Sequence, residues 1–93
     1  MNDETREILL ILQEEAIEVA KEVSKIMRFG PDQCKPNSDE TNIQSLQAEL
    51  GDLAAMVELL TDANIGVTNE GMISAKQKKF EKLKRWSNIR INK

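Results

Sequence analysis

Apolar residues recur every three to four positions along most of this chain, and that helical spacing is the feature that most constrains its fold. The first stretch with this spacing runs from about Asp3 to Arg28 and carries Ile8, Leu12, Val19, Val23 and Ile26. Asn2 or Asp3 can cap its start, and Gly30 followed by Pro31 is a strong stop signal. The pattern therefore predicts one long first helix.

Two further helices are expected after a polar stretch, 31–40, that contains both prolines and is predicted to be a loop. The second is expected over about 41–63, with an apolar stripe formed by Leu46, Leu50, Leu53, Val57 and Leu60. The third is expected over about 69–86, and the residues from Ser87 onward are either a docked extended tail or a frayed end. Alternating strand patterns are absent outside this tail. The sequence predicts an all-α fold, with three main helices in one domain, 1–93.

The small size of the chain predicts that the bundle is completed by oligomerisation. A domain of 93 residues buries only about 60–65% of the surface of its unfolded chain, so association is a plausible source of added stability. Three helices would also leave one flank of the bundle uncovered, which a second copy would close.

Cysteine, histidine and charge content restrict the kind of site that the chain can build. With one cysteine, Cys34, and no histidine, neither a disulfide framework nor a Cys/His zinc site is available. The acidic start and the lack of a long apolar run predict a cytoplasmic protein with no membrane partner. Residues 1–75 carry 5 basic and 15 acidic side chains, a net charge of −10, whereas 76–93 carry 8 basic and 1 acidic, a net charge of +7.

Two acidic pairs occupy matching positions in the first two helices, Glu15 with Glu18 and Glu49 with Asp52. Residues at i and i+3 lie about 60° apart around a helix, so each pair shares one face, beside the apolar stripe. Four carboxylates that meet at a core edge repel one another and lose hydration, and a divalent cation relieves both costs. Such pairs on packed helices build metal sites in bundles, and the absence of histidine favours Mg²⁺ or Mn²⁺ over a di-iron centre. Either pair alone would be read as solvated surface, but the match between them favours a metal site.

The same residues resemble a known family. The motif Glu15-x-x-Glu18 within LQEEAIEVAKEVSK and the motif Glu49-x-x-Asp52 within NIQSLQAELGDLAAMVELL resemble the signature of the MazG-type nucleotide pyrophosphohydrolases, which are all-α proteins. The ending KQKKFEKLKRWSNI is similar to short phage-encoded members. The resemblance implies Mg²⁺-dependent hydrolysis of a nucleoside or deoxynucleoside triphosphate to the monophosphate and pyrophosphate. It further implies a homodimer or homotetramer, located in the host cytoplasm if the chain is phage-encoded.

Other roles follow from this resemblance and from the chemistry that it implies. The four acids of the two motifs would hold the metal, and a carboxylate off the metal would take the proton from water, with Glu14 as the first candidate and Glu22 as the second. Lys79 and Lys82 match basic positions in the last helix of the family and are assigned to phosphate contacts. Leu83 stands where the family usually has an arginine. Arg28 and Lys35 are further candidates for contacts with phosphate.

Two alternative functions come from other classes. The basic segment 76–93 could neutralise nucleic-acid phosphates, although the body is acidic and aromatic residues for stacking are scarce. The chain could also be a helical oligomer without catalytic activity. The sequence does not identify the preferred base or sugar.

Overall fold

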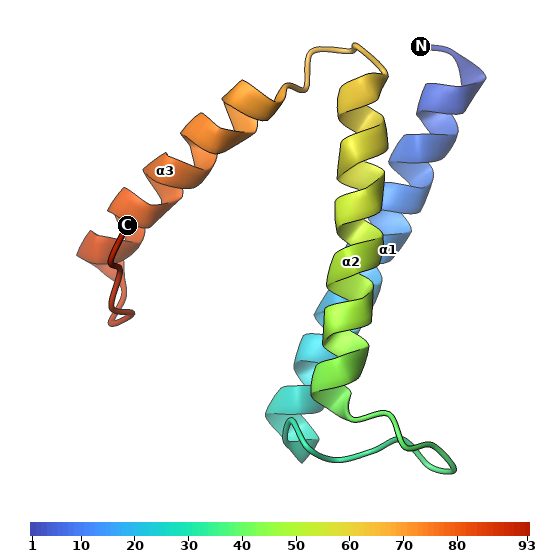
Figure 1. Cartoon of the computed structure of the whole chain (residues 1–93), viewed down its shortest axis with the longest axis vertical. Helices are drawn as coiled ribbons and strands as arrows, with labels where there is room; N and C mark the ends of the chain where they lie inside the picture. The colour runs from blue at the N-terminus through green and yellow to red at the C-terminus, as the bar shows by residue number, and fades with distance from the viewer. The chain divides into compact units, whose positions relative to one another are not determined.

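The computed structural model describes the whole chain, Met1–Lys93, and is all-helical, with three helices and no strands. The helices are α1 (Asp3–Phe29), α2 (Asn42–Asp62) and α3 (Asn69–Trp86), and they are labelled in Figure 1. Together they hold 71% of the residues, which confirms the predicted fold class. The chain divides into two compact units, Met1–Ala63 and Asn64–Lys93. The grouping of all 93 residues in one domain stays a prediction.

Local capping explains where the helices begin and end. The Asn2 side chain accepts a hydrogen bond from the Thr5 amide at the start of α1, and Gly30, with a φ of 91°, follows its end. The Thr41 side chain caps α2 in a reciprocal capping box with Gln44. Thr68 caps α3. The observed ends lie within one residue of those predicted from the sequence.

In the first unit, α1 and α2 pack side by side as an antiparallel hairpin (Figure 1). The α1 face toward α2 follows alternating steps of three and four residues, as in a coiled-coil seam. Its buried and half-buried residues are Thr5, Ile8, Leu12, Glu15, Val19, Glu22 and Ile26. The facing residues of α2 with the same degrees of burial include Asn42, Ser45, Glu49, Leu53, Met56 and Leu60. The seam is therefore apolar near the open end of the hairpin and increasingly polar toward the loop.

Most of the stripe predicted from the apolar spacing is covered: Ile8, Leu12, Val19 and Ile26 of α1 and Leu46, Leu53, Val57 and Leu60 of α2 are buried or half-buried. Val23 and Leu50 were expected in the core, yet they are 44% and 47% exposed, whereas Glu22 is only 3% exposed. In a two-helix hairpin, each helix buries only the stripe that faces its partner. Apolar residues elsewhere on the helix therefore stay exposed to solvent. The only buried large apolar residues are Ile8 and Leu60, which are 8% and 7% exposed. The hairpin thus leaves many large apolar side chains uncovered.

In the second unit, the residues after α3 form an irregular tail that returns along the helix. The Ser87 hydroxyl donates to the Leu83 carbonyl, and the Lys93 ammonium lies 5.3 Å from the centre of the Phe80 ring. Ile91 is half-buried. Of the two alternatives left open by the sequence, the structure has the docked tail.

Candidate metal centre

Three of the four predicted metal ligands meet on the hairpin. Glu49 and Asp52 lie one turn apart on α2, and Glu15 reaches them from α1 across the seam. One carboxylate oxygen from each of the three lies within 4.8 Å of the other two, and no other group of three acidic or cysteine side chains meets in this way. Glu15 and Glu49 are half-buried, and Asp52 is exposed. The cluster is thus open to solvent on one side.

The carboxylates of the cluster repel one another, because no cationic side chain lies among them. Partial burial raises the pKa of Glu15, and it is raised further by a side-chain hydrogen bond with Glu49 and by the charges of Glu49, Asp52 and Glu18. When Glu15 is protonated, its carboxyl group can donate to Glu49. When both are ionised, neither can donate, and Glu49 Oε2 is a buried atom without a hydrogen-bond partner. The site therefore favours either a proton or a cation.

The donor set fits a hard divalent cation. Mg²⁺ holds its oxygen ligands at about 2.0–2.1 Å, so opposite ligands lie about 4.2 Å apart and adjacent ligands about 2.9 Å apart. Because at most one pair among three octahedral ligands is opposite, these oxygens, which lie within 4.8 Å of one another, would move closer together by side-chain rotation to bind one ion. The unpartnered Glu49 Oε2 is an atom that such a cation would satisfy. The exposed side of Asp52 leaves room for water and phosphate oxygens in the remaining positions.

The fourth predicted ligand, Glu18, lies outside this group of three. Its Oε1 atom pairs with Lys21 Nζ at 3.3 Å, and its side chain is 41% exposed. An exposed i, i+3 pair contributes little, about 0–1 kcal/mol, so Glu18 can leave Lys21 and turn toward the cluster at small cost. Its assignment as a ligand stays a prediction.

The two candidates for the proton acceptor lie in contrasting environments. Glu14 is exposed. Glu22 is buried in the seam, where its Oε1 atom pairs with Lys25 Nζ at 3.2 Å and its Oε2 atom has no partner. Glu22 follows Glu15 by two helical turns, about 10 Å along the axis. Ser45, for which no role was predicted, is also buried with an unpartnered hydroxyl.

The basic residues assigned to phosphate lie in different parts of the chain. Lys79 and Lys82 are exposed on α3, in the second unit. Arg28 is exposed at the end of α1, where its guanidinium carbon lies 5.3 Å from the centre of the Phe29 ring. Lys35 is half-buried in the loop. The first unit has five cationic side chains, and all of them except Arg6 lie within residues 21–35, toward the loop end of the hairpin.

Comparisons with models of known protein families, with curated proteins and with solved structures found no match to this chain. The fold and the cluster therefore define its class only as an all-helical chain with a carboxylate centre. No helix is both long and apolar enough to span a bilayer.

Proposed function

We propose that this chain is a divalent-metal-dependent nucleoside triphosphate pyrophosphohydrolase of the MazG type, with Mg²⁺ as its cofactor and Mn²⁺ able to substitute. The observation that carries the proposal is the meeting of Glu15, Glu49 and Asp52, from two helices, together with the absence of a hydrogen-bond partner for the buried Glu49 Oε2 atom. The resemblance of the two acidic motifs to that family supplies the reaction. The helical fold and the position of the two motifs on facing helices are compatible with a metal cluster and with the reaction of that family.

In the proposed mechanism, the carboxylates of Glu15, Glu49 and Asp52 would hold the cation, and Glu18, which pairs with Lys21 in this structure, would be a fourth ligand. When bound, the cation neutralises phosphate charge and lowers the pKa of an attacking water. Water attacks the α-phosphorus, the bond to the β-phosphate oxygen breaks, and pyrophosphate leaves. The displaced proton passes to a carboxylate of the chain, for which Glu22 Oε2 is favoured over exposed Glu14 because it has no competing partner.

The proposal includes assembly with further copies of the chain. Large apolar side chains on the outer faces of the hairpin are about half-exposed, among them Leu10, Ile17, Val23, Ile43 and Leu50. Extended apolar surface of this kind marks interfaces in stable proteins. A homodimer or homotetramer would cover it and close the bundle. Sedimentation analysis of the purified chain measures this directly, and a monomer at micromolar concentration would contradict it.

Phosphate contacts are proposed for four basic residues, Lys79, Lys82, Arg28 and Lys35. The charge of segment 76–93 also supports a second candidate function, nucleic-acid binding. A gel-shift assay at several salt concentrations separates the two functions. Retention of single- or double-stranded nucleic acid near 150 mM salt, without pyrophosphate release, would favour the second.

Pyrophosphate release is the test of the proposed reaction. The purified chain, with Mg²⁺, is assayed against each common ribonucleoside and deoxyribonucleoside triphosphate. We expect release of pyrophosphate and monophosphate from at least one of them, and loss of that activity in Glu49→Gln. Activity that survives in Glu49→Gln, or in the presence of excess EDTA, would contradict the metal assignment. No turnover of any triphosphate would favour an oligomer without catalytic activity.

A further inference from the structure

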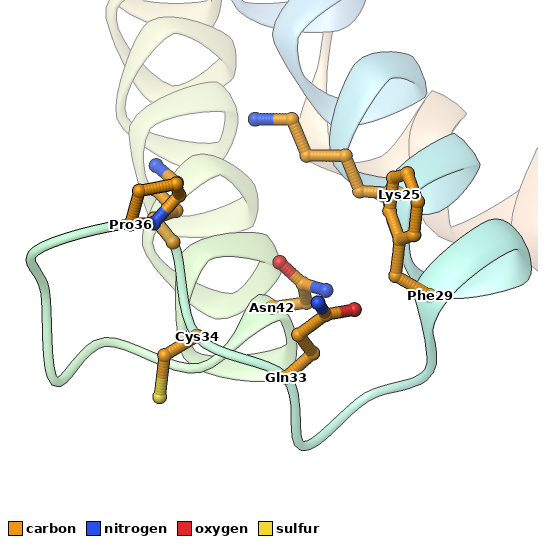
Figure 2. A pocket seen from close by; sticks show the side chains of 7 residues that line it. Lys25, Phe29, Gln33, Cys34, Pro36 and Asn42 are labelled. Atoms are coloured by element: carbon orange, nitrogen blue, oxygen red, sulfur yellow. The ribbon is translucent and has the colours of Figure 1, made fainter.

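A pocket separate from the acidic cluster opens at the loop end of the hairpin. It has a volume of about 480 Å³, which lies within the range of small-molecule sites. Figure 2 shows the amides of Gln33 and Asn42 in the middle of the pocket, with Lys25 and Phe29 on one side and Pro36 on the other. All of its lining residues belong to the first unit.

Hydrogen bonds between the loop and the start of α2 form this pocket in advance of any ligand. The side chain of Asn42, which is only 4% exposed, donates to the Gly30 carbonyl at 3.0 Å. The Asn42 and Ile43 amides donate to the Gln33 and Pro31 carbonyls at 2.9 and 3.0 Å. A single antiparallel bridge joins Cys34 to Thr41. The loop is therefore held at both sides of the pocket, and a ligand would need to order little of it.

The charge of the pocket is opposite to that of its surroundings. Residues 1–63 carry 5 basic and 14 acidic side chains, a net charge of −9, yet the pocket lining includes Lys25 and Lys35 and no acidic residue. Lys35 is free of ion pairs, whereas Lys25 is shared with Glu22. Such a wall attracts an anion or electron-rich carbonyl oxygens.

The apolar part of the wall adds a flat ring. Phe29 is 54% exposed at the pocket rim, and the Arg28 guanidinium lies near its ring. An exposed ring next to cations is a platform on which a base can stack, and such stacking is tolerant of the base. The Gln33 amide is exposed and takes part in none of the loop's side-chain hydrogen bonds, so it can both donate to and accept from the edge of a base.

We propose that this pocket binds the base and sugar of a nucleotide, with the base against Phe29 and its edge at Gln33. The direction of the nucleotide rests on the proposed function, because the phosphates extend along the outside of the hairpin toward the exposed side of the Glu15, Glu49 and Asp52 cluster. Asn42 precedes Glu49 by seven residues, and Lys25 follows Glu15 by ten, so pocket and cluster lie about 10–15 Å apart along the helices. An extended nucleoside triphosphate spans a comparable length. Lys25 and Lys35 then contact the ribose-proximal phosphate or base carbonyl oxygens.

The test is a heteronuclear NMR titration of the full chain, which reports binding independently of turnover. The ligands are nucleoside triphosphates with an α,β-methylene bridge, which resist the proposed hydrolysis, the corresponding nucleosides, and inorganic tripolyphosphate. We expect nucleotides and, more weakly, nucleosides to shift the side-chain amides of Gln33 and Asn42 and the backbone amides of the loop. Tripolyphosphate is expected to leave the chemical shifts of the Gln33 side-chain amide unchanged.

Matched variants at the end of α1 test the stacking contact. Phe29→Ala and Phe29→Leu should weaken nucleotide binding about 10-fold, which is the scale of base–aromatic stacking. Met27→Ala removes a side chain that is 81% exposed and outside the pocket, so it should bind as the original chain does. The dispersion of the amide spectrum shows whether each variant is folded, and Phe29→Leu keeps an apolar side chain at the position.

The outcomes separate this pocket from the proposed reaction. Equal shifts with tripolyphosphate and nucleotides, or unchanged affinity in Phe29→Leu, would overturn base binding. Pyrophosphate release without shifts in the loop would overturn the pocket and leave the reaction standing. Loop shifts that depend on the base, in a chain without turnover, would support the pocket and count against the reaction.

Discussion

Glu22 is a buried carboxylate that only one partner compensates, so its replacement by leucine should stabilise the metal-free chain. Its side chain is 5% exposed, Oε1 pairs with Lys25 at 3.2 Å, and Oε2 is unpartnered. Replacement of buried ion pairs by apolar residues of similar volume commonly stabilises by about 1–4 kcal/mol. The Lys25 side chain is 39% exposed, so water can hydrate its ammonium group after Glu22 is replaced. The loss of the ion pair should therefore remove little of the gain in stability. We expect about 1–2 kcal/mol, which raises Tm by about 4–16 °C in a chain of this size.

Thermal unfolding in EDTA at pH 7, followed by circular dichroism, measures this change. Glu81→Leu is the matched control, because Glu81 pairs with Lys84 at the same i, i+3 spacing and 3.0 Å, but both side chains are at least 40% exposed. That variant should change stability by no more than about 0.5 kcal/mol. A lower Tm for Glu22→Leu, with helical content unchanged, would refute the description of Glu22 as an under-compensated buried charge.

Three further predictions concern the cluster, the cap of α2 and the proton acceptor. The pKa of Glu15 is raised in the folded chain, so the folded state holds this proton more tightly than the unfolded state does. Without metal, the free energy of unfolding should therefore fall as the pH rises from the ordinary glutamate pKa of about 4.5 through the raised pKa of Glu15. Urea titrations across this range should show a weaker pH dependence in Glu15→Gln, and identical profiles would contradict the assignment. Thr41→Ala removes the capping box and should cost about 1 kcal/mol, or about 4–8 °C in Tm; an unchanged Tm would mean that the cap contributes nothing. Glu22→Gln should slow pyrophosphate release at saturating substrate far more than Glu14→Gln, and the reverse order would exchange their roles.

The helices and their ends could be predicted from the sequence because their signals are local. Asn2, Thr41 and Thr68 are good N-cap residues, and Gly30 with Pro31 marks a stop that needs no tertiary contact. The face that each helix buries was predicted for most of its residues, but the edges of that face were not. A helix with apolar residues on more than half its circumference has several possible core faces, and the partner decides among them. Val23 was therefore predicted in the seam that Glu22 occupies.

The part of the candidate site that depends on local helical spacing was predictable from the sequence. The i, i+3 spacing fixed the relation of Glu49 to Asp52, and the matching motif pointed to α1, where Glu15 does meet them. Helical spacing alone could not show that Glu18 turns toward Lys21. The loop pocket was missed because its walls come from segments that only the closed loop brings together. The sequence shows only an asparagine, Asn42, directly after the α2 cap. Its side-chain hydrogen bond to the Gly30 carbonyl, which closes the loop, is visible in the structure alone.

The proposed function requires that the Glu15, Glu49 and Asp52 cluster binds a divalent cation, and a Mn²⁺ titration measures this binding. The electron paramagnetic resonance signal of free Mn²⁺ is followed as protein is added, at pH 7, with the original chain and with Asp52→Asn. We predict loss of the free-ion signal with the original chain, competition by Mg²⁺, and affinity at least 10-fold weaker in Asp52→Asn. A signal that the protein leaves unchanged, or equal binding by the two chains, would contradict the metal centre.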